Sequence, residues 1–200
     1  PVQPQGTPPP PSPAARKSPR GWVLLDRDGV INQEKPGSYV LQPEEWVPIP
    51  GSPEAIARLC EGGLGVIVLT NQSAIGRGLL DLDTLEAIHA KLIRTIEESG
   101  GHIAGIFFCP HHPDEDCECR KPKAGLIHQA ERSLGCSLEG APMVGDQSRD
   151  LQAARQAGCR PILVRTGRGR EVRSDGKELE GVAVYETLSE AVTEILKASH

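Results

Sequence analysis

A surplus of basic charge and long apolar runs are both missing from this 200-residue chain. Acidic residues outnumber Lys and Arg by 27 to 22, the formal net charge is -5, and the pI is about 5.7. Such a balance argues against the basic face that nucleic acids or anionic membranes attract. No apolar run approaches the roughly 18 residues of a membrane-spanning helix. We therefore expect neither nucleic acid nor a membrane among its partners.

The first twenty residues also lack the apolar stretch of a secretory signal. Eight of them are proline, and so few large apolar side chains cannot offset the entropy lost on ordering a segment. We interpret residues 1–20 as a disordered leader and residues 21–200 as one domain. At 38% hydrophobic residues, the chain can build one good core. The cytoplasm and a monomeric state are the default expectations.

Short apolar runs alternate with segments of helical periodicity along the rest of the chain. They predict strands at 22–25, 64–69, 103–108, 141–145, 161–164 and 182–185, separated by helices that include N-terminal caps at Ser52, Asp83 and Thr187. This alternation is typical of right-handed crossovers and of a sheet covered on both faces. We predict an α/β fold, a Rossmann-like three-layer sandwich with a mainly parallel sheet.

Polar side chains follow several of these strands at the point where each strand ends. Asp26 and Asp28 follow the first strand, Thr70 the second and Asp146 the fourth, while Lys121 lies in the loop after the third. The carboxyl ends of parallel strands share one edge, so these groups should converge. Three carboxylates repel one another unless a hard cation lies among them. We predict Mg²⁺ on the three Asp residues, with Thr70 and Lys121 holding a phosphate.

The two leading acids can divide the chemistry of phosphoryl transfer. A carboxylate can attack phosphorus and form an aspartyl-phosphate, and we assign this role to Asp26. A second carboxyl on the same side of an extended stretch can serve as general acid and then as base, and we assign this role to Asp28. The intervening Arg27 should point away, so we interpret it as a structural or surface cation.

Three of the six cysteines lie close together, with a histidine, in one loop. The candidate ligands are Cys109, His111, Cys117 and Cys119. A Cys₃His set typically closes around structural Zn²⁺ in a tetrahedron and leaves no position for substrate. His112 is an alternative to His111. The zinc-stabilised loop would fix Arg120 and Lys121, which follow the last ligand directly.

A long loop over residues 33–50 should form a flap beside the pocket, with Tyr39 as a candidate sugar contact and Trp46 packed beneath it. Only 43 residues separate Asp26 from Thr70, and 50 separate Thr70 from Lys121. Core helices and strands fill much of both intervals, so we expect no large cap domain.

Five motifs, in this order along the chain, resemble those of the haloacid dehalogenase phosphatase superfamily. They are Asp26-Arg27-Asp28-Gly29, Thr70-Asn71-Gln72-Ser73, Cys109-Pro110-His111-His112, Cys117-Glu118-Cys119-Arg120-Lys121-Pro122 and Gly145-Asp146. Over roughly residues 21–168 the chain is most similar to the bacterial D-glycero-D-manno-heptose 1,7-bisphosphate 7-phosphatases.

This resemblance implies removal of the 7-phosphate through an aspartyl-phosphate, on the route to the nucleotide-activated heptose of lipopolysaccharide core or surface glycans. It implies the roles already assigned to the three Asp residues, and zinc on His111 rather than His112. It also implies that substrate is bound by Thr70, Asn71, Gln72, Ser73, Arg120 and Lys121. Gln147 departs from the Lys of some members, so one substrate-binding cation is missing there. Asp150 fits either a supporting carboxylate or an acid at a helix start.

Three other functions stay open on the sequence. A histidinol-phosphate phosphatase of histidine biosynthesis has similar motifs. A phosphoryl-accepting signalling domain also places Asp, Thr and Lys around Mg²⁺ on a parallel sheet, but its aspartyl-phosphate would be long-lived. A non-catalytic binding module stabilised by zinc would release no phosphate.

Overall fold

Six parallel strands form the central sheet, in the order β3-β2-β1-β4-β5-β6. The structure, a computed structural model, describes residues 18–173 and 177–199, so most of the predicted leader lies outside the described residues. The strands are β1 (Gly21–Leu25), β2 (Leu64–Asn71), β3 (Gly105–Cys109), β4 (Pro142–Gly145), β5 (Arg160–Val164) and β6 (Ala183–Tyr185). The parallel sheet is therefore confirmed, with each predicted strand within two residues of its observed bounds.

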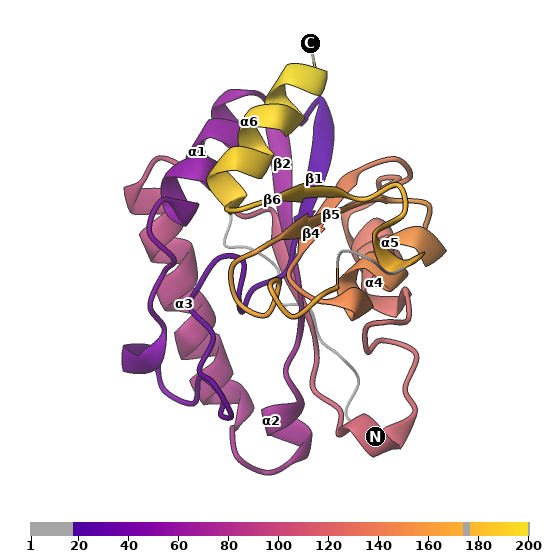
Figure 1. Ribbon diagram of the computed structural model, residues 1–200. Helices are drawn as coiled ribbons and strands as arrows, with labels where there is room; N and C mark the ends of the chain where they lie inside the picture. Colours follow the sequence, from indigo (N-terminus) through magenta and orange to yellow (C-terminus); the bar gives the residue numbers. More distant parts are fainter. Residues whose placement is uncertain (1–17, 174–176, 200) are drawn as a thin grey trace.

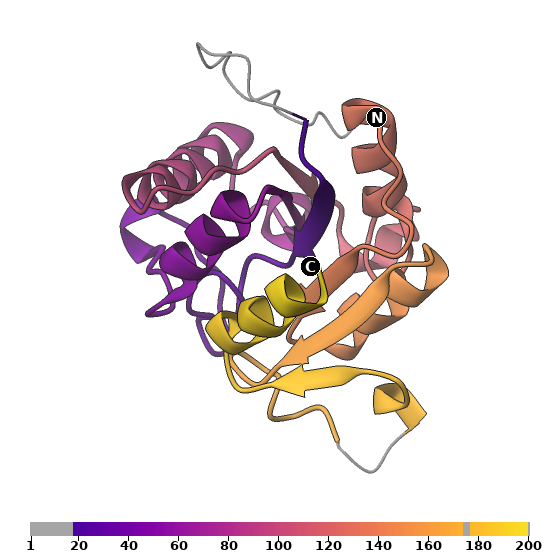
Figure 2. The same ribbon diagram turned by 90° about the horizontal axis from the view of Figure 1, so that it is seen from above.

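Helices cover both faces of the sheet and make the predicted three layers (Figures 1 and 2). One side carries α1 (Ser52–Glu61), α3 (Leu82–Glu98) and α6 (Leu188–Ala198), and the other carries α4 (Gly125–Leu134) and α5 (Ser148–Gln156). The short elements are α2 (Ser73–Gly76) and the 3₁₀ turns η1 (Pro43–Glu45), η2 (Pro113–Glu115) and η3 (Lys177–Leu179). Among the described residues, no helix is long and apolar enough to cross a bilayer.

The central strand β1 shows why this sheet needs both helical layers. Val23 and Leu25 belong to the core under α1, α3 and α6, whereas Leu24 belongs to the core under α4. All three side chains are fully buried. A continuous apolar run is what a strand buried on both faces requires.

Two predicted helix starts are wrong by one or two residues. The N-cap of α1 is Gly51, and the hydroxyl of Ser52 donates to the carbonyl of Ile31 instead of capping the helix. The N-cap of α3 is Asp81, whose Oδ1 accepts from the backbone N of Thr84 at 2.7 Å. Asp81 has the extended backbone that a capping residue needs, so the nearby acid at position 83 falls inside the first turn. The predicted cap at Thr187 is confirmed.

The strand order reverses between β1 and β4, which are direct neighbours in the sheet. In open α/β sheets, a crevice forms at the carboxyl ends of the strands where the order reverses. Leu25 pairs with Val144, and the backbone N of Asp26 donates to the carbonyl of Val144 at 3.0 Å. The fold thus brings the ends of β1 and β4, and the acids that follow them, to one point.

Candidate active site

Three buried carboxylates meet at that crevice. They belong to Asp26, Asp146 and Asp150, and each offers an oxygen within 4.8 Å of the others. The first two follow the ends of β1 and β4, as the sequence predicts. Asp150 comes from the first turn of α5, where its carboxylate also accepts from the backbone N of Gln147 at 3.1 Å. Asp150 is therefore both a helix-start acid and a member of the cluster.

Lys121 partly balances these carboxylates. Its Nζ lies 2.8 Å from Asp26 Oδ1, 2.7 Å from Asp150 Oδ1 and 2.8 Å from the carbonyl of Leu69, so all three of its protons have acceptors. Burial by itself would lower the pKa of Lys121, but Asp150 and Asp26 raise it above its ordinary value. Asn71 fixes the Lys121 backbone, donating to its carbonyl and accepting from its N–H, both at 3.1 Å. The predicted ammonium is therefore charged and tightly positioned.

Asp146 is the strongest indication of a cation. It is fully buried, its Oδ1 has no hydrogen-bond partner, and its Oδ2 accepts from the backbone N of Arg168 at 2.9 Å. A Cβ at Gly29 or Gly167 would lie 2.1 or 2.2 Å from Oδ2, so only glycine lets both loops approach this carboxylate. Burial and the charge of Asp26 raise the pKa of Asp146 to about 8. An unpaired buried carboxylate oxygen beside a second carboxylate fits a hard cation such as Mg²⁺.

The carboxylate of Asp28 takes part in a different network. Among the described residues, the acidic cluster does not include its side chain. Arg27 grips Asp28 from the neighbouring position, with Nη2 at 2.8 Å from Oδ1 and 3.0 Å from Oδ2, and Asn32 and Gln72 donate to it as well. Burial would raise the pKa of Asp28, but the guanidinium and these hydrogen bonds lower it.

This arrangement bears on two predictions. The structure does not bring the Asp28 side chain to Asp26 and Asp146 as a third metal ligand, because Arg27 already holds both of its oxygens. The prediction that Arg27 points away from its neighbours is wrong, and of the two interpretations offered for it, a surface cation is wrong and a structural cation fits its burial. Its side chain is fully buried and bends back onto Asp28.

The segment after β2 lines the same crevice. Thr70 is buried, and its hydroxyl accepts from Gln72 Nε2 at 2.9 Å. The same amide donates to Asp28 Oδ2 at 3.0 Å, so Gln72 links the phosphate-site threonine to the candidate acid/base. Ser73 is the first residue of α2 and also faces the cavity. Asn71 instead acts on the Lys121 backbone.

Asp26, Asp28 and residues 70–73 line a cavity of about 340 Å³ that is rich in cations. Its basic residues are Lys35, Arg77, Arg120, Arg149 and Arg168. Arg120 Nη1 and Arg149 Nε are buried without a hydrogen-bond partner. Burial, and then the charge of Arg149, lower the pKa of Arg120. Unpaired guanidinium donors gathered around one cavity are well suited to a phosphate or carboxylate.

Sequence reasoning found only Arg120 among these arginines. Arg77 directly follows α2, Arg149 lies in α5 and Arg168 lies in the loop after β5, and no local motif marks them. One signal was present: Arg149 lies two residues after Gln147, the position noted for its missing Lys. A cation lost at a helix start can be replaced from the next residues of the same turn.

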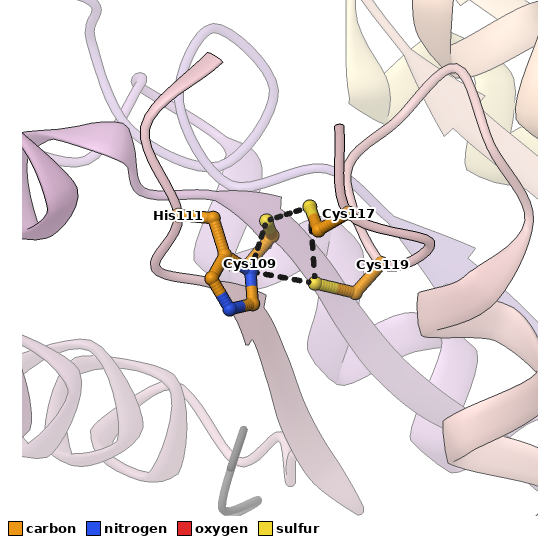
Figure 3. A group of neighbouring side chains, drawn as sticks. All are labelled: Cys109, His111, Cys117 and Cys119. Atoms are coloured by element: carbon orange, nitrogen blue, oxygen red, sulfur yellow. Dashed lines mark hydrogen bonds between the residues drawn. The ribbon is translucent and has the colours of Figure 1, made fainter. Parts of the chain in front are cut away.

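The Cys/His loop forms a compact four-ligand cluster at the end of β3 (Figure 3). Cys109 Sγ lies 3.5 Å from both His111 Nδ1 and Cys117 Sγ, while Cys119 Sγ lies 3.2 Å from the imidazole and 3.6 Å from Cys117. The edges of a tetrahedron with metal–sulfur bonds near 2.3 Å measure about 3.7 Å. The hydrogen bond between the two thiols lowers the pKa of Cys109 to about 5 and raises the pKa of Cys119, so without a metal the thiolate of this pair is on Cys109. The cluster fits a zinc site.

His112 is not part of this cluster. Its Nδ1 accepts from the backbone N of Asp114 at 3.2 Å and caps η2, which leaves His111 as the imidazole ligand. The loop is also packed tightly against α2, because a Cβ at Gly76 would lie 2.2 Å from the backbone N of His112. The loop that carries Arg120 and Lys121 is therefore fixed from two sides.

The flap over residues 33–50 is fastened to α3. Lys91 Nζ donates to the carbonyls of Pro43 and Trp46, both at 2.8 Å. Trp46 is fully buried, which confirms that it packs beneath the loop, and Tyr39 lines the cavity. The flap is thus a wall of the pocket with its own hydrogen bonds.

Without added Mg²⁺, the buried carboxyls of Asp26 and Asp146 should destabilise the protein as the pH rises. Burial raises the pKa of Asp26 to about 6 and that of Asp146 to about 8, from ordinary values of 3.8. Between pH 4 and 8 these two carboxyls therefore bind more protons in the folded state than in the unfolded state, so their contribution to the free energy of unfolding falls as the pH rises, by a few kcal/mol in total. The lowered pKa values of Cys109 and of the buried His89 act in the opposite direction, so the contribution of the carboxyls is measured as the difference between the unmodified protein and Asp146→Asn. Thermal unfolding across this range, with and without Mg²⁺, measures the effect.

Mg²⁺ replaces those protons, so its stabilising effect should grow over the same pH range. Asp146→Asn is the control, because an amide cannot titrate and the decline near pH 8 should disappear. The same pH dependence of the melting temperature in Asp146→Asn as in the unmodified protein, both without Mg²⁺, would contradict the proposed electrostatics.

The chain is similar to known phosphatases over most of its length. A family model described as HAD-hydrolase-like matches residues 118–191. D-glycero-beta-D-manno-heptose-1,7-bisphosphate 7-phosphatase of Bordetella bronchiseptica is 47% identical over 175 residues, which are 88% of this chain and 97% of that protein. The enzyme of that name from Pseudomonas aeruginosa is 47% identical over 179 residues, 89% and 99% of the two chains.

A solved structure shows the same similarity in three dimensions. The crystal structure of D,D-heptose 1,7-bisphosphate phosphatase from B. bronchiseptica, complexed with magnesium and phosphate, matches with a TM-score of 0.85 and 46% identity. The match covers 89% of this chain and 99% of that one.

Proposed function

Since the chain belongs to the family of D-glycero-beta-D-manno-heptose-1,7-bisphosphate 7-phosphatases, we propose that it hydrolyses the 7-phosphate of this heptose bisphosphate with Mg²⁺ as cofactor. The observation that carries the proposal is Asp146, whose unpaired buried oxygen lies in one cluster with Asp26, and Asp26 lines a cavity rich in arginine. We propose the β anomer, which the names of the relatives specify. The product would enter the route to nucleotide-activated heptose for lipopolysaccharide or surface glycans.

The first half of the reaction transfers the phosphoryl group to Asp26. Its carboxylate oxygen forms a bond to phosphorus as the bond from phosphorus to the sugar oxygen breaks, and Asp28 gives that oxygen a proton. Mg²⁺ on Asp26 and Asp146 would neutralise charge on the phosphoryl oxygens, and Lys121 and Thr70 would bind the same oxygens. The low pKa of Asp28 in the free protein is opposed by bound substrate, since a neighbouring anion raises the pKa of a carboxyl.

The second half returns the enzyme to its starting state. Asp28, now ionised, takes a proton from water, whose oxygen forms a bond to phosphorus as the bond to Asp26 breaks. Inorganic phosphate leaves, Asp26 is again a carboxylate and Asp28 again carries a proton. Its position outside the Asp26–Asp146–Asp150 cluster leaves Asp28 free for both transfers.

A second phosphate on the substrate explains the additional arginines. Lys121 and Thr70 are assigned to the transferred group, yet Arg120 and Arg149, each with a buried donor that has no partner, also line the cavity. We propose that these two arginines bind the phosphate that is not removed, with Arg149 replacing the cation absent at Gln147. Histidinol phosphate carries one phosphate and a positively charged amine, so this cavity favours it less.

We also propose Zn²⁺ in the Cys109–His111–Cys117–Cys119 cluster, because three thiolates and one imidazole are the ligands of a closed structural zinc site. A site that needs reduced thiols favours the cytoplasm. A monomer remains our expectation.

Phosphate release with a panel of phosphate esters tests the substrate. With Mg²⁺ present, we expect the highest kcat/KM on the β-heptose 1,7-bisphosphate, lower values on heptose 7-phosphate, and the lowest on histidinol phosphate. Arg149→Gln should lower kcat/KM on the bisphosphate about 10- to 100-fold, the loss typical of one charged hydrogen bond, and leave the monophosphate rate unchanged.

Arg170→Gln is the matched control, since Arg170 pairs with Glu186 on the surface, away from the cavity lining. It should leave both rates unchanged. A faster rate on histidinol phosphate than on the bisphosphate would overturn the substrate assignment.

A further inference from the structure

Arg27 occupies an unusual place for a charged residue beside a nucleophile. Its side chain is fully buried, and no part of the phosphatase chemistry described above uses it. The guanidinium contacts Asp28 through three hydrogen bonds: Nε to Oδ1 at 3.1 Å, Nη2 to Oδ1 at 2.8 Å and Nη2 to Oδ2 at 3.0 Å. Such a forked pair fixes the plane of the carboxylate as well as its distance.

The other end of the guanidinium is held by His89 on α3. Arg27 Nη1 lies 3.2 Å from His89 Nε2. Burial, and then the charge of Arg27, lower the pKa of His89 to about 3, so the imidazole is neutral. Since Arg27 can only donate, His89 Nε2 is the acceptor and its proton is on Nδ1. The ring of His89 is tilted against Phe108, with 6.0 Å between centroids, which fixes its position in the core.

Two amides complete the environment of the Asp28 carboxylate. Asn32 Nδ2 donates to Oδ1 at 2.9 Å and Gln72 Nε2 donates to Oδ2 at 3.0 Å. Together with Arg27, they give this side chain five hydrogen bonds, although about a quarter of it (27%) stays exposed to the cavity. The carboxylate can therefore reach substrate but cannot turn toward Asp26 and Asp146 without breaking most of these bonds.

We propose that Arg27, supported by His89, is a positioning residue that holds the Asp28 carboxylate at the leaving-group side of the cavity and away from the metal cluster. A free carboxylate two residues from Asp26 would otherwise be drawn toward a divalent cation and be lost as a proton donor. Burying a guanidinium is costly, and an apolar side chain of the same volume would fill the space more cheaply. A charged side chain at position 27 is thus explained by the Asp28 carboxylate that it positions.

The inference rests on the phosphatase chemistry proposed above, but it does not depend on the sugar. The test compares two phosphate esters: the alkyl phosphate that the unmodified protein hydrolyses fastest, and p-nitrophenyl phosphate. The alkoxide leaving group needs a proton from Asp28, whereas p-nitrophenolate is stable enough to leave without one. The measured quantity is the rate of aspartyl-phosphate formation in a rapid-quench experiment with saturating Mg²⁺.

Arg27→Met should lower this rate about 100-fold with the alkyl phosphate, the lower end of what general acid catalysis contributes, and less than about 5-fold with p-nitrophenyl phosphate. Arg27→Lys can restore one of the lost hydrogen bonds and should recover part of the alkyl rate. His89→Leu removes the acceptor for Arg27 and should also lower the rate with the alkyl phosphate more than the rate with p-nitrophenyl phosphate, but by a smaller factor than Arg27→Met. His89→Gln keeps an acceptor oxygen, so both of its rates should stay close to those of the unmodified protein.

Leu85→Val, one turn earlier on α3 and equally buried, is the control for a purely structural disturbance. It should lower the melting temperature without changing the ratio of the two rates. Equal losses on both esters in Arg27→Met, or in His89→Leu if the Arg27 variant does not fold, would overturn the proposal, as would an unchanged ratio. If the heptose assignment is wrong, the best alkyl substrate changes but the ratio does not.

Discussion

Asp26→Asn should abolish phosphate release, with a fall in kcat of at least about 10⁴-fold, as is typical when a covalent nucleophile is removed. The amide cannot attack phosphorus, and it is also a weaker ligand for Mg²⁺. The fold should survive, because Lys121 keeps Asp150 and the carbonyl of Leu69 as acceptors. Since burial raises the pKa of Asp26 to about 6, losing its charge should even stabilise the metal-free protein near neutral pH. Activity and melting temperature are therefore expected to move in opposite directions.

Asp28→Asn is the informative comparison. With p-nitrophenyl phosphate its first step needs no proton donor, but the second step lacks a base, so acid-quenched samples should contain aspartyl-phosphate. Asp26→Asn should contain none under the same conditions. Phosphate release by Asp26→Asn at the normal rate would contradict the assigned nucleophile. A long-lived aspartyl-phosphate in the unmodified protein would favour the signalling domain over the phosphatase.

The convergence of Asp26, Asp146 and Lys121 could be predicted from the sequence because it follows from topology. An apolar run that ends in an acid places that acid at the carboxyl edge of a parallel sheet, whatever the details of packing. The fold class followed from the same alternation, and the zinc cluster from the density of ligands in one loop. In each case a short stretch of sequence carries the pattern that predicts the feature, and folding only brings the predicted residues close together.

What the sequence could not supply is side-chain direction. Alternation along an extended stretch predicts that the Arg27 side chain points to the opposite side from those of Asp26 and Asp28. The chain turns after Asp26, however, and the guanidinium of Arg27 bends back to Asp28. The cations around the cavity could not be predicted from the sequence for a related reason. Arg77, Arg149 and Arg168 are far apart in the chain and carry no motif, so only the assembled loops show that they share one cavity.

The zinc cluster offers the second large effect: Cys119→Ser should remove most phosphatase activity, at least about 100-fold, although none of the four ligands lines the cavity. Cys119 directly precedes Arg120 and Lys121. If the metal is lost, the loop between β3 and α4 loses its closure, and apparent binding free energies of about 10–16 kcal/mol for zinc in small peptides show how much order such a site can supply. Lys121 would then no longer be held 2.8 Å from Asp26.

Metal content, activity and unfolding of the same samples test this together. The unmodified protein should contain one zinc per chain, and Cys119→Ser should contain much less and melt at a lower temperature. Cys136→Ser is the matched control, because this thiol is partly buried but lies outside the cluster. Removing zinc with a chelator and then restoring only Mg²⁺ should reproduce the loss. Full activity in a zinc-free sample would contradict the prediction. It would mean that packing against Gly76 and the hydrogen bond from the Lys121 backbone N to Asn71 position Arg120 and Lys121 without the metal.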